Sequence, residues 1–124
     1  MQILAGVRSL SGLNARLEDL LEVERKEALS NEVVKHFIKN YVVATGQVPS
    51  ISLSSMNARL EMVPKEIRDE IIGSEEVITF CINYVSGQNQ TEYIGRSATR
   101  FRLSLVPELI RERVASAPEV AKKL

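Results

Sequence analysis

The chain has 124 residues, of which 44% are hydrophobic and 26% are charged, a balance that is ordinary for a folded globular protein and excludes an intrinsically disordered one. Its 16 Lys and Arg residues equal its 16 Asp and Glu residues, so it lacks the basic excess with which most nucleic-acid-binding proteins neutralise phosphates. The single cysteine, Cys81, excludes an internal disulfide and predicts an intracellular protein.

We therefore expect a cytoplasmic location by default. No apolar run reaches the ~20 residues that a membrane-spanning helix needs. The first sixteen residues contain Arg8, Arg16, several serines and no acidic residue, as organelle transit peptides do. Their second half belongs to the repeat described next. We therefore expect them to begin the fold, and organelle targeting is kept as an alternative.

A long stretch near the N-terminus recurs 43 residues later. Residues 9–42 align without a gap on residues 52–85, and 16 of these 34 positions are identical. A third copy follows at the same spacing, because VPKEIRDEI from Val63 falls on VPELIRERV from Val106. Such a period predicts stacked supersecondary units. We expect a single domain over 1–124, built from units 9–51, 52–94 and a partial 95–124.

The first unit is expected to contain two helices. Residues 12–29 are rich in strong helix formers and place leucines at the spacing of one helical face. Ser11 is expected to cap this helix. A second amphipathic helix is expected within residues 30–46, where Gly46 would end it in a left-handed conformation.

The second unit contains an ambiguous stretch, residues 75–85. Taken alone, EEVITFCINYV resembles a strand, because β-branched and aromatic residues dominate it. Its apolar positions nevertheless match those of the second helix in the first unit, so we expect a helix. Pro64 and Pro107 stand where the first unit has Leu21, and proline suits a first helical turn or a kink. We therefore expect the first helix of the later units to break at Val63 and Val106 and to restart at the proline.

Three short helices in each unit of about 43 residues predict an all-α fold of tandem helical repeats. The unit is similar to armadillo and HEAT repeats in length only.

Residues 99–114, TRFRLSLVPELIRERV, support an alternative α+β fold. Apolar and polar residues alternate at first, as in a strand, and a proline and a helical pattern follow. This order resembles the ribbon-helix-helix family of DNA-binding repressors, in which paired strands lie in the major groove. The resemblance implies base contacts by Arg100, Arg102 and Ser104. The helix-favouring sequence of the earlier copies and the zero net charge count against it.

Few residues suggest catalysis or metal binding. His36 is the only histidine, and Thr79 and Lys122 occupy its place in the other copies, so we expect a solvated surface position. Cys81 aligns with Ile38 and is expected to be a small buried side chain. One His and one Cys cannot form a zinc site, and no two carboxylates pair in an apolar setting. We expect no catalytic residue, metal or cofactor, and no enzyme.

The recurring arginines are the candidate interaction residues. Their side chains are expected to cover contacts between units, paired with glutamates such as Glu18, Glu22 or Glu27, or alternatively to face a ligand. Tyr41 and Tyr84 are expected in the core. The two recurring sets are Arg16, Arg59, Arg102 and Arg25, Arg68, Arg111.

Stacked helical units leave long exposed faces. We therefore expect a non-catalytic interaction module that binds a protein partner or assembles with itself. The third unit stops at Leu124, halfway through its second helix, so we expect a second copy or another chain to cover apolar surface there. The alternative is a DNA-binding transcriptional regulator. Neither a membrane nor a small-molecule substrate is expected.

Overall fold

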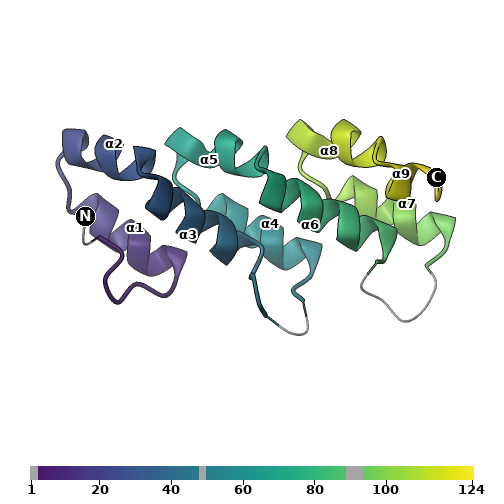
Figure 1. Ribbon diagram of the computed structural model, residues 1–124, viewed down its shortest axis with the longest axis horizontal. Helices are drawn as coiled ribbons and strands as arrows, with labels where there is room; N and C mark the ends of the chain where they lie inside the picture. Colours follow the sequence, from purple (N-terminus) through teal and green to yellow (C-terminus); the bar gives the residue numbers. More distant parts are fainter. Residues whose placement is uncertain (1–2, 48–49, 89–93) are drawn as a thin grey trace.

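The computed structural model describes residues 3–47, 50–88 and 94–124. These residues form helices and contain no strand, which confirms the predicted all-α fold (Figure 1). The helices are α1 Leu10–Glu18, α2 Glu22–Ser30, α3 Glu32–Val42, α4 Leu53–Glu61, α5 Lys65–Ile72, α6 Glu75–Ser86, α7 Arg96–Ser104, α8 Glu108–Ala115 and α9 Pro118–Ala121.

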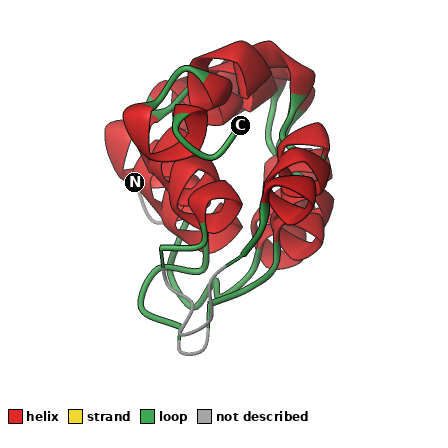
Figure 2. Ribbon diagram, turned by 90° about the vertical axis from the view of Figure 1, so that its right-hand side faces the viewer, coloured by secondary structure: helices red, strands yellow, loops and turns green. Residues whose placement is uncertain are grey.

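The helices lie in three rows along an elongated molecule, with the two termini near opposite ends (Figure 1). One row contains α1, α4 and α7, a second contains α2, α5 and α8, and a third contains α3 and α6, with the short α9 packed on α6 and α8. The end-on view shows the rows surrounding a common interior (Figure 2). We refer to α1–α3, α4–α6 and α7–α9 as the first, second and third helix groups.

One apolar cluster runs through this interior and receives side chains from all three rows. Residues 43 positions apart are buried alike in the first two groups. The fully buried pairs include Leu10 and Leu53, Leu13 and Met56, Val34 and Val77, Ile38 and Cys81, and Val42 and Val85.

The first group differs from the expected continuous helix over residues 12–29. The helix is interrupted between α1 and α2, although no proline is present. Leu21 has φ −64° and ψ 154°, which is an extended conformation that proline also adopts. Its N–H donates to the Glu24 carboxylate at 3.1 Å. The interruption leaves the Leu21 side chain 73% exposed, outside the apolar stripe in which the leucine spacing placed it.

The cap of α1 also differs from the prediction. The helix begins two residues earlier than expected, and the hydroxyl of Ser9, not that of Ser11, accepts from the Gly12 N–H at 3.1 Å. In the later groups the predicted breaks are confirmed. Pro64 and Pro107 are the N-cap residues of α5 and α8, which begin at the next residue.

The ambiguous residues 75–85 are helical, as predicted, and form most of α6. Gly46 does not end α3, which stops at Val42, so this prediction was wrong. The left-handed residue that follows α3 more closely is Ala44, with φ 52°. It lies 43 positions before Gly87, which has φ 73° and caps α6.

The ribbon-helix-helix alternative is wrong for the described chain. Its expected strand lies within α7, where helical hydrogen bonds replace strand pairing. The alternation of Phe101, Leu103 and Leu105 does not define a buried face. Phe101 is 66% exposed, whereas the two leucines pack against the core. Among the described helices, none combines the length and apolar character that crossing a bilayer requires.

Candidate interaction site

Asparagine side chains connect α1 and α4 to the helix group that follows each of them. Nδ2 of Asn14 donates to the Met62 carbonyl at 2.8 Å, and Nδ2 of Asn57 donates to the Leu105 carbonyl, also at 2.8 Å. Met62 and Leu105 are the C-cap residues of α4 and α7, where carbonyls lack partners within their own helix. The same contact therefore occurs at two positions 43 residues apart.

Arginine and tyrosine form a second contact between groups. Nη1 of Arg59 in α4 donates to the Tyr41 carbonyl at 2.6 Å, and its guanidinium carbon lies 4.4 Å from the centroid of the Tyr41 ring. Arg102 in α7 donates to the Tyr84 carbonyl at 2.8 Å and lies 4.6 Å from the Tyr84 ring centroid. A hydrogen bond and a cation–π contact thus hold each guanidinium against the preceding third-row helix. Arg16, the first of this set, is exposed and donates to the Ile3 carbonyl.

Two arginines of the other set donate hydrogen bonds to backbone carbonyls at the breaks between first-row and second-row helices. Nη2 of Arg68 donates to the carbonyls of Glu61 and Val63, each at 2.8 Å. Arg111 makes the corresponding bonds to Ser104 at 3.3 Å and Val106 at 3.0 Å. These side chains supply donors to carbonyls at the helix ends.

Arg25 behaves differently from Arg68 and Arg111. It pairs with Glu66 of the next group, Nε to Oε2 at 2.8 Å, and not with the nearby glutamates that the sequence suggested. This hydrogen bond lowers the pKa of the Glu66 carboxyl to about 2 and raises the pKa of Arg25.

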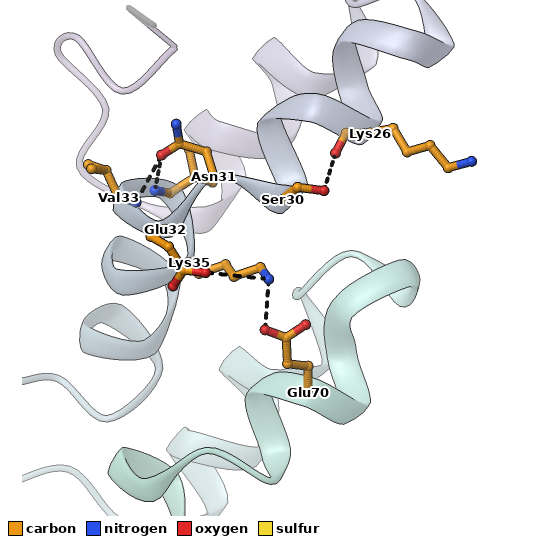
Figure 3. Close-up of polar contacts among 8 residues, drawn as sticks. Lys26, Ser30, Asn31, Glu32, Val33, Lys35 and Glu70 are labelled. Carbon is orange, nitrogen blue, oxygen red and sulfur yellow. Dashed lines mark hydrogen bonds and ion pairs between the residues drawn. The ribbon is translucent and has the colours of Figure 1, made fainter.

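A second ion pair links the first and second groups beside it. Lys35 of α3 points toward α5, where its Nζ lies 2.9 Å from Oε2 of Glu70 (Figure 3). The hydrogen bond to Glu70 raises the pKa of Lys35. Both pairs border a cleft of about 300 Å³ between α2, α3 and α5. At the next junction Leu109 and Arg113 stand in place of Glu66 and Glu70, so these pairs do not recur there.

The third-row helices carry a matching set of aromatic and amide side chains. The rings of Phe37 and Tyr41 stack with centroids 6.3 Å apart, and those of Phe80 and Tyr84 stack with centroids 6.2 Å apart. The tyrosines were expected in the core, but they are half-buried and pack against its edge. A ring there cannot enter the interior, because Ile38 and Cys81 already fill the inward positions of the same helices.

A cavity of about 320 Å³ opens at the first of these sets. Its described lining includes the rings of Phe37 and Tyr41, the polar side chains of Asn40, Thr45 and Gln47, and the Arg59 guanidinium. Asn40 Oδ1 accepts from the Thr45 hydroxyl at 3.2 Å. We call this cavity the junction pocket.

The candidate arginines contribute unequally to the junction pocket. The structure brings Arg59 into it, and it places Arg102 in the same setting over Tyr84. Sequence reasoning missed Asn40 and its counterpart Asn83. The signal for them was present, because an asparagine recurs at the same position of the two matching helical segments.

The residues suggested for DNA contact lie on α7, where Arg102 faces a different side of the helix from Arg100 and Ser104. Arg100 is exposed, Arg102 is held at Tyr84, and the Ser104 hydroxyl donates to the Phe101 carbonyl. His36 is exposed, as expected. Cys81 is fully buried, as predicted, and burial raises the pKa of its thiol to about 12.

Within 3–47, 50–88 and 94–124, no group of three His, Cys, Asp or Glu side chains is arranged to hold a metal ion. Comparisons with protein-family models, with curated proteins and with solved structures found no match to this chain.

Proposed function

We propose that this protein is a non-catalytic tandem helical-repeat module that binds a protein partner along the row of α3 and α6. The proposed repeat has 43 residues, with units 9–51, 52–94 and a partial 95–124 in one domain. Residues 48–49 and 89–93, which fall within the first two units, lie outside the described residues. The buried pairs and the asparagine contacts at this spacing support the repeat.

The observation that carries the proposal is the recurrence of one half-exposed arrangement on α3 and α6. Phe37, Asn40 and Tyr41 on α3 correspond to Phe80, Asn83 and Tyr84 on α6, and an arginine from the next group lies over each tyrosine. Tyrosine and arginine are enriched among the residues that dominate protein–protein binding energy. Their stacked geometry is already formed in the free chain, which lowers the entropy cost of binding.

A protein that binds along this row should crosslink to residues on α3 and α6 and not to residues on α2 and α5. We would insert a photo-crosslinking amino acid at His36 or Thr79, which are exposed on α3 and α6, and as matched controls at Lys26 or Asp69, which are exposed on α2 and α5. We expect the two third-row positions to capture the same protein, which mass spectrometry identifies, and the control positions to capture none of it.

The identified protein would then be purified and its binding measured by calorimetry. We expect the double variant Asn40→Ala and Asn83→Ala to weaken binding and Lys26→Ala to leave it unchanged. Equal capture from both rows, or binding that is indifferent to the asparagine variants, would rule the proposal out.

Nucleic-acid binding is a second candidate, favoured by α7. This helix contains three arginines and no acidic residue, and Phe101 stands 66% exposed between Arg100 and Arg102. Binding to random duplex and single-stranded DNA would be measured across a salt series, because phosphate contacts make affinity fall steeply with salt. The absence of binding at low salt removes this candidate.

A further inference from the structure

We propose that the junction pocket binds the C-terminal residue of the partner protein, with the terminal carboxylate on Arg59 and an apolar side chain against the rings of Phe37 and Tyr41. The inference rests on the proposed function and names the part of the partner that is recognised. It concerns this pocket alone. It follows from the charge of the pocket, from its hydrogen-bond donors and from its apolar lining.

The charge of the junction pocket favours an anion. Arg59 is half-buried, and among the described residues no Asp or Glu lines the pocket or forms an ion pair with Arg59. The C-terminal end of α3, whose Tyr41 carbonyl accepts from Arg59, carries a partial charge of about −0.5. The full positive charge of the guanidinium exceeds this, so the pocket stays electropositive. Arg25, by contrast, already has the Glu66 carboxylate as its partner.

The polar side chains of the pocket present donors to this anion. A guanidinium has five N–H groups, and in the described chain Arg59 makes one hydrogen bond, from Nη1 to the Tyr41 carbonyl. The Tyr41 carbonyl and ring hold the guanidinium in one orientation, and its forked donors match the two oxygens of a carboxylate. Oδ1 of Asn40 already accepts from the Thr45 hydroxyl, so the Asn40 amide offers its Nδ2 donors to a ligand.

The apolar part of the lining selects a C-terminal residue over an internal acidic one. The rings of Phe37 and Tyr41 stack, and Ala44 also lines the pocket. A C-terminal residue carries its carboxylate and its side chain on the same carbon atom, so both fit one cavity of about 320 Å³. An internal Asp or Glu fills the polar part alone, because its side chain ends at the carboxylate. Capture of a terminal carboxylate is a general mode of peptide recognition.

Peptides that differ only at the last residue test this chemistry. The probe is N-acetylated Ser-Gly-Ser-Gly-Ser-Leu with a free C-terminal carboxylate, titrated into the isotopically labelled full chain and followed by NMR. We expect it to shift the amide signals of Asn40, Thr45 and Gln47. The C-terminal amide of this peptide should bind roughly tenfold more weakly, the scale of a hydrogen bond to a charged group. Gly in place of the last Leu should weaken binding roughly fivefold, the scale of partial burial of the side chain. No shift at millimolar peptide, or equal affinities of the acid and the amide, would overturn the inference.

A further peptide separates a terminal carboxylate from a side-chain carboxylate. N-acetylated Ser-Gly-Glu-Leu-Ser-Gly with a C-terminal amide carries the same single negative charge within its chain. We expect it to bind no more tightly than the amide of the first peptide. If it binds as tightly as the free acid, the pocket recognises acidic side chains and the C-terminal assignment is overturned.

A charge placed in the junction pocket tests the location. Gln47 is exposed and lines the pocket, so Gln47→Glu should weaken binding of the free-acid peptide roughly three- to fivefold, the scale of one solvent-accessible charge pair. Gln47→Lys should strengthen it. Ser11→Glu adds the same charge at an exposed position of α1, outside the described lining of the pocket, and should change nothing. These substitutions alter neither Arg59 nor a buried side chain, and circular dichroism verifies folding. An unchanged affinity of Gln47→Glu would overturn the inference.

The partner captured by crosslinking separates this inference from the proposed function. A Ser-Gly-Ser-Gly tail fused to the C-terminus of that protein should weaken its binding, and the same tail at its N-terminus should not. If the protein is captured at His36 and Thr79 but tolerates the C-terminal tail, the inference fails and the proposed function stands. If these positions capture no protein, the proposed function fails, and the inference, which names part of that protein, fails with it.

Discussion

The hydrogen bond from Asn57 to the Leu105 carbonyl offers a direct test of how the helix groups are joined. Asn57→Ala removes the donor and leaves a half-buried carbonyl at the end of α7 without its partner. Asn14→Ala does the same to the Met62 carbonyl at the end of α4. If the two contacts are equivalent, the two variants should lower the free energy of unfolding by the same amount.

The expected cost combines opposing terms. Loss of the bond and incomplete solvation of the carbonyl cost about 1.5–2 kcal/mol, while alanine is favoured over asparagine within a helix by about 0.5 kcal/mol. The net loss in the free energy of unfolding is about 1–1.5 kcal/mol for either variant. At this chain length it lowers Tm by about 4–6 °C.

Asn57→Asp sharpens the test, because a carboxylate cannot donate and would place an acceptor against the Leu105 carbonyl. At neutral pH we expect Asn57→Asp to lower the free energy of unfolding by more than Asn57→Ala does. The protonated acid can donate, so the pKa of Asp at this position is raised in the folded protein. Its stabilising contribution is therefore fully present below the ordinary aspartate pKa and is lost as pH rises through the raised folded value.

Urea and thermal unfolding followed by circular dichroism measure these effects, with Ser54→Ala on the exposed side of α4 as a control. The reasoning is refuted if Asn57→Ala is neutral, if Asn14→Ala and Asn57→Ala differ by more than about 1 kcal/mol, which is the size of one hydrogen bond, or if Asn57→Asp is no worse than Asn57→Ala at pH 7.

Three further predictions concern the helix break, the buried thiol and an ion pair. Leu21→Pro should be tolerated, because the φ of Leu21 is already −64°. A stiffer unfolded chain stabilises the folded protein by up to about 1 kcal/mol, and loss of the N–H bond to Glu24 offsets this gain. A drop in Tm of more than about 5 °C would contradict the prediction. Cys81, with its pKa at about 12, should react with Ellman's reagent at pH 8 only after unfolding; rapid reaction of the native protein would show that the thiol is accessible. The pKa of Glu66 falls from 4.5 to about 2 on folding, so its pairing with Arg25 stabilises above pH 4.5 and is lost as pH falls toward 2. Glu66→Gln should flatten this part of the pH–stability curve by under 1 kcal/mol, because the pair is partly exposed, and high salt should abolish the difference; an unchanged curve would mean that the pair does not form.

Residues 75–85 show how well a local sequence pattern predicts secondary structure. Their β-branched composition favoured a strand, but the spacing of Val77, Cys81 and Val85 favoured a helix, and these three side chains are fully buried in α6. The periodicity was the better guide because burial on one helical face outweighs the small differences in intrinsic propensity.

The break at Leu21 shows the opposite case. The residues around it have high helix propensity, and without a proline the sequence predicted one helix through this point. In the structure α1 and α2 belong to different rows, so the chain turns between them. Packing of each row against the core outweighs the propensity of a few residues, which is well under 1 kcal/mol for each.

The helical class, the breaks at Pro64 and Pro107 and the buried face of α6 were readable from the chain alone, because they depend on local residue types and on residues three or four positions apart. The junction pocket was not readable in this way. Arg59 reaches the carbonyl of a residue 18 positions away, and Asn14 reaches one that is 48 positions away. Such contacts depend on how neighbouring helices are placed in space, and that placement is set by the packing of the whole core.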